Sequence, residues 1–106
     1  MMKIAILSLS MFFTVGCAVH KHGQEFSGIV ETACGECIFH MTGDECDLAV
    51  KIEEEYYFVE GSTVDEHGDA HAEDGLCSVA RKAQVVGTIR GGVFYATSFE
   101  LLEVEK

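Results

Sequence analysis

The sequence feature that most constrains the fold is a pair of glycines near the C-terminal end of the chain. Gly91 and Gly92 separate two runs that are rich in β-branched and aromatic residues, 84–90 and 93–102. Adjacent glycines between such runs predict a two-residue β-hairpin, because the turns that match strand twist need positive φ angles. Alternate residues of the second run are expected to share one face of the sheet: Tyr95, Thr97, Phe99 and Leu101.

Three further strands are predicted ahead of this hairpin: residues 25–33, residues 47–53 and residues 56–59. Polarity alternates residue by residue in the second of them, which predicts a half-buried strand. Its inward-facing side chains are expected to be Leu48, Val50 and Ile52. Residues 70–83 have a different period, because their apolar side chains recur at helical spacing. Arg81 and Lys82 would lie in the last turn, where cations stabilise a helix, so this segment is predicted to be a helix.

The predicted order is therefore strand, strand, strand, helix, strand, strand. This mainly β order resembles the OB-fold, a small five-stranded barrel with its helix between the third and fourth strands. An open antiparallel sheet with one packed helix is the alternative. The 106 residues leave room for one small domain, placed at residues 25–104. Burial alone stabilises such a domain weakly, so disulfides or a bound metal would contribute a large share of its stability.

Residues 1–17 have the features of an export signal. A single cation, Lys3, precedes an apolar run at residues 4–13, and small residues and Cys17 follow. This order of charge, apolar core and small residues is typical of secretory signals. The apolar run is too short for a membrane-spanning helix. The protein is therefore expected to be exported to the cell envelope or periplasm.

The end of this signal resembles the bacterial lipobox. In residues 14–17, Gly precedes a cysteine that would become lipidated, although Thr14 stands where Leu is usual. A lipid on Cys17 would anchor the protein to a membrane without spanning it. Residues 18–24 would then form a tether. Ordinary signal cleavage near Ala18 is the alternative.

The chain is strongly acidic once this signal is excluded. Loss of residues 1–17 removes Lys3 and leaves six of the seven Lys and Arg residues against 18 Asp and Glu residues. Such a field repels phosphate backbones, which excludes nucleic acid as a partner. An acidic surface is suited to cations or basic proteins, although solubility alone would also explain it. The expected partners are the membrane, through the anchor, a metal ion and an unidentified envelope protein.

Four cysteines follow the signal, all within one central stretch: Cys34, Cys37, Cys46 and Cys77. An even number in a small exported domain predicts two disulfides, for which three pairings are open. The same four thiolates could instead form a tetrahedral site of the kind that zinc prefers. Alternatively, Cys37, His40 and Met41 offer soft donors that are suited to copper.

A second group of metal-ligand residue types lies in the motif 67–71. If a helix runs here, His67 and His71 share a face, and Asp69 could complete a set of two imidazoles and one carboxylate. The alternative is an acidic loop in which Asp69 or Asp74 caps the helix and the histidines are solvated.

The motif at residues 34–37, Cys-Gly-Glu-Cys, also permits thiol redox chemistry. A thioredoxin-like site needs a cis-proline opposite the dithiol, and the chain has no Pro. A c-type haem site needs His directly after the second cysteine, where Ile38 stands. No Ser-His-Asp set, phosphate-binding loop or carboxylate pair stands out, so no catalytic residues are predicted.

Several motifs together resemble those of a family of short exported bacterial proteins of unknown function. They are Cys34-x2-Cys37, Cys46-Asp47-Leu48-Ala49-Val50, His67-Gly68-Asp69-Ala70-His71, Asp74-Gly75-Leu76-Cys77 and Phe94-x-Ala96-Thr97-x-Phe99-x-Leu101-Leu102. The resemblance covers nearly the whole mature chain and implies a secreted or lipid-anchored single domain. It implies no activity, substrate or cofactor.

These observations give three hypotheses for function. The first is a non-catalytic envelope protein that binds a transition metal, zinc or copper, through its four cysteines, aided by His67, Asp69 and His71. The second is an interaction module in which the cysteines are structural disulfides and no metal is bound. The third is a thiol redox protein, for which a reducible Cys34–Cys37 disulfide would be the sign.

Overall fold

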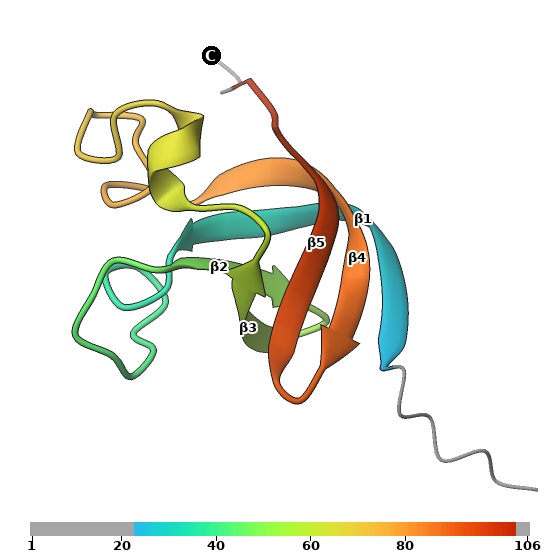
Figure 1. Ribbon diagram of the computed structural model, residues 1–106. Helices are drawn as coiled ribbons and strands as arrows, with labels where there is room; N and C mark the ends of the chain where they lie inside the picture. The colour runs from blue at the N-terminus through green and yellow to red at the C-terminus, as the bar shows by residue number, and fades with distance from the viewer. Residues whose placement is uncertain (1–22, 104–106) are drawn as a thin grey trace, which may run out of the picture.

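The computed structural model describes residues 23–103, which form a closed barrel of five strands in the order β1-β2-β3-β5-β4 (Figure 1). The elements are β1 (Gln24–Cys34), β2 (Leu48–Ile52), β3 (Glu55–Glu60), the 3-10 turn η1 (Val64–His67), β4 (Arg81–Arg90) and β5 (Val93–Leu101). This confirms the predicted mainly β, five-stranded OB-like barrel and excludes the open sheet. The export signal, Cys17 and residues 18–22 lie outside the described residues. Within residues 23–103, no helix is long and apolar enough to cross a membrane.

Strand β1 closes the barrel because it pairs with two neighbours. Residues 24–32 run antiparallel to β4, and residues 31–34 run antiparallel to β2. Strand β3 pairs in parallel with β5 through residues 58–60. A parallel pair needs a long crossover connection, and the chain that contains η1 and β4 supplies it.

The interior of the barrel holds one cluster of buried side chains, here called the barrel core: Val30, Val50, Ile52, Ala83, Val85 and Phe94. The alternation predicted for β2 is confirmed, since Leu48, Val50 and Ile52 are all buried. Ala49 is buried as well, because the backbone of Gly35 packs against its outward face. Strand β2 is therefore covered on both sides at Ala49, whereas Lys51 on the outer face is partly exposed.

The predicted face of β5 is correct for one half of the strand and wrong for the other. Phe99 and Leu101 pack inward, whereas Tyr95 is exposed and its neighbour Phe94 is fully buried. The cause is a bulge, because the register shifts from Val86↔Ser98 to Gly87↔Ala96. An extra residue on one strand reverses the faces of the side chains that precede it.

The helix predicted for residues 70–83 is wrong. Residues 70–80 run through turns, and β4 begins at Arg81. The apolar residues that have helical spacing do not belong to one element. Leu76 is a buried residue of a turn, and Ala83 is a buried residue of β4. Strand pairing with β1 and β5 satisfies the backbone of residues 81–83 and outweighs the local helical pattern.

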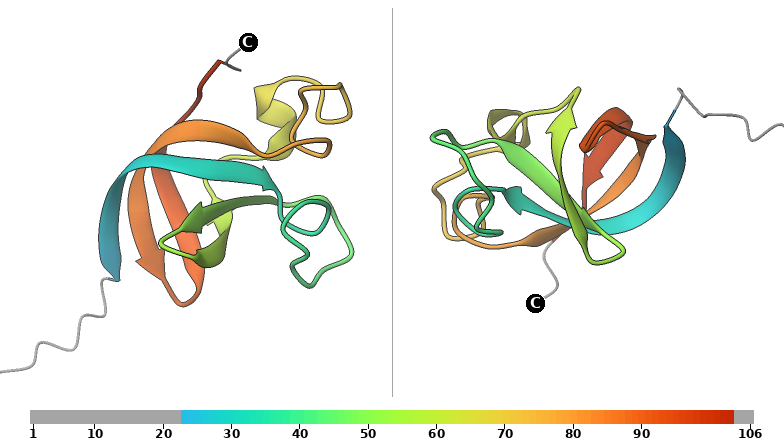
Figure 2. Two further views of the ribbon diagram at one scale, coloured as in Figure 1. Left: turned by 180° about the vertical axis from the view of Figure 1, so that it is seen from behind. Right: turned by 90° about the horizontal axis from the view of Figure 1, so that it is seen from below.

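Two long loops lie side by side at one end of the barrel, as both Figure 1 and Figure 2 show. The first loop, residues 35–47, joins β1 to β2, and the second loop, residues 61–80, joins β3 to β4 and contains η1. Beneath them lies a second cluster of buried residues, here called the loop core: Cys34, Leu48, Val64, Ala70 and Leu76. The start of β1 and the β4–β5 hairpin lie at the opposite end (Figure 1).

Candidate metal centre

Four cysteine sulfurs meet at the loop end of the barrel. The Sγ atoms of Cys34, Cys37, Cys46 and Cys77 all lie within 4.8 Å of one another, and these residues are called the cysteine cluster below. Cys34 ends β1, and Cys37 lies in the turn that follows. Cys46 and Cys77 come from the ends of the first and second loops. Three separate segments therefore bring sulfur to one place.

Two consecutive backbone amides hold these segments together. The N–H of Cys34 donates to the carbonyl of Leu76 at 2.8 Å, next to Cys77. The N–H of Gly35 donates to the carbonyl of Asp47 at 2.8 Å, next to Cys46. The end of β1 thus positions both partner loops through main-chain hydrogen bonds. The convergence of the sulfurs follows from the path of the backbone.

The turn after β1 folds Cys37 back toward Cys34. The N–H of Ile38 donates to the carbonyl of Cys34 at 3.0 Å, which makes one helical turn. Gly35 is required in this turn, because a Cβ there would lie 2.7 Å from Cε1 of Phe58 and 2.8 Å from Sδ of Met41. The glycine of the Cys-x2-Cys motif therefore allows the turn to lie against the barrel.

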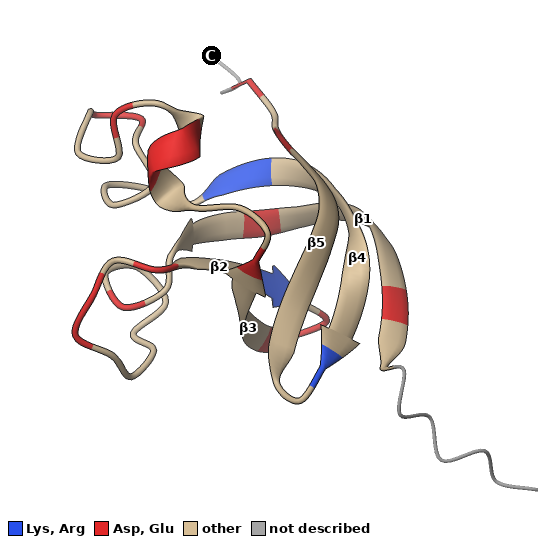
Figure 3. Ribbon diagram, in the orientation of Figure 1, with Lys and Arg blue, Asp and Glu red and all other residues tan. Residues whose placement is uncertain are grey.

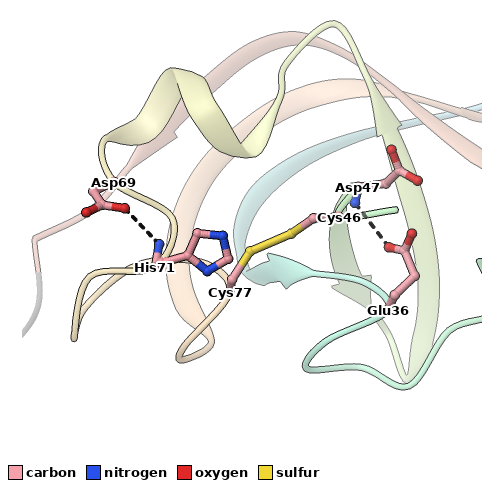
Figure 4. The surroundings of a disulfide bond; sticks show 6 residues. All are labelled: Glu36, Cys46, Asp47, Asp69, His71 and Cys77. Atoms are coloured by element: carbon pink, nitrogen blue, oxygen red, sulfur yellow. Dashed lines mark hydrogen bonds between the residues drawn. A yellow bond between two sulfur atoms is a disulfide. The ribbon is translucent and has the colours of Figure 1, made fainter. Parts of the chain in front are cut away.

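The structure joins Cys46 and Cys77 by a disulfide (Figure 4). Within residues 23–103, Cys34 and Cys37 are free thiols. The Cα atoms of Cys46 and Cys77 are 7.4 Å apart, beyond the usual range of about 4.4–6.8 Å for disulfides. Four sulfurs around one zinc ion would be about 3.8 Å apart, given zinc–sulfur bonds of about 2.3 Å. That spacing falls within the 4.8 Å envelope of the cysteine cluster. The geometry of the cluster therefore fits two alternative states, one with four thiolates around a metal ion and one with a disulfide.

Burial distinguishes the two free thiols. Cys34 is fully buried, and burial, followed by its hydrogen bond with Cys37, raises the pKa of its thiol to about 11. Such a thiol is protonated near neutral pH and is a poor nucleophile, which disfavours disulfide exchange through Cys34. Cys37 is exposed. A metal ion would have to displace protons from these thiols, so its binding would strengthen as pH rises.

Carboxylates surround the cysteine cluster. The two loops carry nine Asp and Glu residues and no Lys or Arg, and Figure 3 shows these acidic segments at the loop end of the barrel. A groove beside Cys46 is lined by three of these acids, Asp47, Asp65 and Glu66, and by Glu60 at the end of β3. The resulting negative field raises the local concentration of cations.

Glu36 and Asp47 interact with each other beside Cys46 (Figure 4). The N–H of Asp47 donates to Oε1 of Glu36 at 3.1 Å. Burial raises the pKa of Glu36, but hydrogen bonds from backbone amides, that of Asp47 first, lower it by more. Burial and the neighbouring Glu36 raise the pKa of Asp47. These two carboxyls were not selected as site residues from the sequence, although Glu36 lies inside the Cys-x2-Cys motif.

The motif 67–71 lies beside the cysteine cluster without joining it. Among the described residues, the group of converging ligand atoms contains the four sulfurs and neither His67, Asp69 nor His71. His71 is exposed, and its N–H donates to Oδ1 of Asp69 at 3.0 Å (Figure 4). This Asx turn occupies the carboxylate of Asp69 locally. The third histidine considered from the sequence, His40, is also exposed.

His67 has a structural contact that the sequence did not indicate. Its Nε2 lies 2.7 Å from the hydroxyl of the buried Ser62, and its ring lies 5.0 Å from that of Phe99. Burial lowers the pKa of His67, which favours the neutral imidazole. His67 therefore fastens η1 to β5. Ser62 gave no sequence signal because a lone serine in a loop has many roles.

Comparison with known proteins points to a family and to no activity. No curated protein and no solved structure matches the chain. One family model does match, over residues 28–102, and this range contains most of β1, the other four strands, both loops and the cysteine cluster. The chain belongs to the family of unknown function DUF6370.

Proposed function

We propose that this protein binds a transition metal ion, zinc or copper(I), through the cysteine cluster and that it is not a catalyst. The observation that carries this proposal is the convergence of four sulfurs from three segments within 4.8 Å. Two disulfides need sulfurs that meet in pairs, which does not require all four to share one place. A common metal ion does require it.

The donor set limits the choice of metal. Four thiolates in a tetrahedral arrangement suit zinc, and thiolates also select copper(I) among the first-row ions. Calcium and magnesium prefer oxygen ligands, so the sulfur cluster disfavours them. The acidic loops support binding of any cation by offsetting its charge.

The proposal includes a place for the protein in the cell. The export signal and the lipobox-like residues 14–17 support a lipid-anchored protein of the cell envelope, with Cys17 as the lipidated residue. The start of β1 lies at the end of the barrel opposite the two loops (Figure 1), where Gln24 pairs with Ile89 near the β4–β5 hairpin. A tether before Gln24 would therefore leave the cysteine cluster facing away from the membrane.

Elemental analysis tests the metal proposal. The full chain, expressed with its own signal and purified without oxygen or chelators, is expected to contain zinc or copper in roughly equimolar amount. Reduced protein stripped of metal should bind added Zn2+ or Cu+ again. Absence of metal from the purified protein, together with no affinity for either added ion, would contradict the proposal.

Single substitutions identify the ligands. Cys37→Ser removes the exposed thiol without opening a cavity in the loop core, and it should weaken metal binding by more than about 100-fold. Ser78→Ala is the matched control, because this exposed residue is adjacent to Cys77 and carries no sulfur. His71→Ala should also leave affinity unchanged, since its ring is outside the group of converging ligands.

One observation favours a second function, that of an interaction module stabilised by disulfides. Cys46 and Cys77 are joined in the structure, and disulfides are common in small exported domains. In that case an envelope protein would be the partner, and chelators would leave the fold and the thiol state unchanged. Alkylation after chelation, without any reducing agent, followed by mass spectrometry separates the two functions. The module predicts a disulfide in every molecule, whereas the metal protein purified without oxygen predicts four alkylatable thiols.

A further inference from the structure

We propose that the disulfide form of this protein holds a metal site of its own, in which Cys34 and Cys37 bind a single copper(I) ion. The fully reduced form binds zinc through the whole cysteine cluster. This inference rests on the proposed metal-binding function. It goes beyond that function because it assigns zinc to the form in which Cys46 and Cys77 are reduced and copper(I) to the form in which they are bonded.

The positions of the two free thiols carry the first step. Cys34 and Cys37 are on one turn, and their Sγ atoms lie within 4.8 Å of each other while Cys46 and Cys77 are joined. Two sulfurs on opposite sides of one ion would be about 4.6 Å apart if the metal–sulfur bonds were as long as those of zinc, about 2.3 Å. The separation of the two thiols is of this order or smaller, so the turn places both within reach of one ion.

The choice of metal follows from the number of donors left. Zinc in proteins is almost always bound by four ligands, or by three protein ligands and water. Once Cys46 and Cys77 are bonded to each other, two thiolates remain, and among the described residues no imidazole or carboxylate joins the converging group. Copper(I) is also selected by thiolate and thioether donors, and unlike zinc it does not need four ligands. The disulfide form should therefore discriminate strongly against zinc.

The surroundings of the turn are also suited to a soft ion. Gly35 lies between the two cysteines in sequence, and Sδ of Met41 packs against it. A Cβ built on Gly35 would be 2.8 Å from this sulfur. The ring of Phe58 closes the same side, 2.7 Å from that Cβ position. Cys34 is completely buried. A thioether and an aromatic ring therefore lie against the turn that carries both thiols, and the thioether is a donor type that favours copper(I).

The two forms are related by a balanced two-electron step, with a peroxide as oxidant. The thiolates of Cys46 and Cys77 lose two electrons and form the sulfur–sulfur bond. Hydrogen peroxide accepts these electrons with two protons and becomes two molecules of water. Zinc leaves as the divalent ion, and the remaining thiolates of Cys34 and Cys37 each take up a proton or bind copper(I).

Metal titration of the two oxidation states tests the inference. Full-chain protein is prepared in the reduced form and in the form where alkylation and mass spectrometry show a Cys46–Cys77 bond and free Cys34 and Cys37. Each form is titrated without oxygen with Zn2+ alone and with Cu+ alone, the latter in competition with a chromogenic copper(I) chelator. The reduced form should bind zinc. The disulfide form should bind one copper(I) ion and should bind zinc more weakly than the reduced form by over about 100-fold.

Three variants sharpen the result. Cys37→Ser should abolish copper(I) binding by the disulfide form, whereas the Ser78→Ala control should retain it. The double variant Cys46→Ser, Cys77→Ser cannot form the bond, and it should bind copper(I) like the oxidised wild type and lose zinc binding. Retention of zinc by that double variant would overturn the assignment.

The failures of the two proposals are distinguishable. If the reduced protein takes up neither metal, the proposed function itself is wrong. If the reduced protein binds zinc but the disulfide form takes up no copper(I), or if oxidation joins Cys34 to Cys37, then this inference alone is wrong.

Discussion

The two hydrophobic clusters of this small barrel are enclosed in different ways. The barrel core, which centres on Phe94 and Val85, is enclosed by five strands whose backbone groups pair along continuous ladders. The loop core, which centres on Leu76 and Cys34, is covered by the two loops. Within residues 23–103, the 3-10 turn η1 is the one regular element that these loops contain. Strand pairing therefore holds the barrel core together, whereas the loop core depends on the contacts that join the two loops.

Sulfur is the main connection between the loops. Cys46 and Cys77 pack against the loop core from the first and second loops, while Cys34 belongs to it. Main-chain hydrogen bonds instead join the second loop to the end of β1, as in the bond from Cys34 to Leu76. We therefore expect the barrel end to stay folded in any redox or metal state. The loop end should instead respond to both, which is the behaviour expected of a functional region.

The largest effect should come from the barrel core. Phe94→Ala removes a fully buried ring that packs edge-to-face against Phe26 with 6.4 Å between centroids. It should lower the free energy of unfolding by about 3–5 kcal/mol, measured by urea denaturation of the disulfide form. Tyr95→Ala, on the outer face of the same strand, is the control and should cost less than about 1 kcal/mol. Equal losses from both would mean that the bulged register of β5 is wrong.

Reduction without metal should have the next largest effect, and it should be local. The Cys46–Cys77 bond closes a segment with a sequence separation of 31, so its loss should cost about 4 kcal/mol of stability. Hydrogen exchange should speed up at the amides of Cys34 and Cys77, whereas amides of β4 should stay protected. Adding zinc should restore protection in the loops. Uniform loss of protection across the barrel would contradict the distinction between the two ends.

Gly75→Ala should disturb the loop core by a smaller amount. A Cβ at this buried glycine would clash with the backbone carbonyls of Asp69 and Ala70, so the second loop must shift, at a cost of about 1–3 kcal/mol. Because Cys77 is two residues away, metal affinity should fall too. Gly43→Ala, on the first loop, is the matched control, since its Cβ would meet the flexible side chain of Glu36. If both substitutions lowered zinc affinity equally, the close packing of Gly75 against the backbone of the second loop would not matter for the metal site, contrary to this account.

The smallest effect should be a pH dependence from His67. Burial lowers its pKa in the folded protein below the ordinary value of 6.5, so the unfolded chain binds more protons in this range. Stability should therefore be complete above about pH 7 and fall as the pH drops through 6.5 toward the folded pKa. His67→Gln should remove this slope between pH 7.5 and about 5.5 in thermal melts. His71→Gln, at an exposed site, should retain it.

Much of the barrel could be predicted from sequence because strands and hairpins have local signals. The glycine turn at 91–92 and the alternation in 48–52 both identify real strands. The bulge that turns Tyr95 outward has no such signal, because it depends on the pairing of β5 with β4. The turn structure of 70–80 was mistaken for a helix because helical spacing in a short segment does not reveal which residues pair with distant strands.

The candidate site shows the same limit. Sequence selected all four cysteines, since their residue type alone marks them, but it could not indicate that they meet at one point. That meeting depends on the hydrogen bonds from Cys34 and Gly35 to the two loops. The histidines were grouped with the cysteines by chain position, and the fold gives His67 a contact with Ser62 in place of the sulfurs.

X-ray absorption at the zinc edge of the reduced, zinc-loaded protein tests the central claim most directly. If the four cysteines act as one site, the spectrum should fit four sulfur neighbours at about 2.3 Å and no nitrogen or oxygen. A first shell that contains imidazole nitrogen or water, or fewer than four sulfurs, would contradict it.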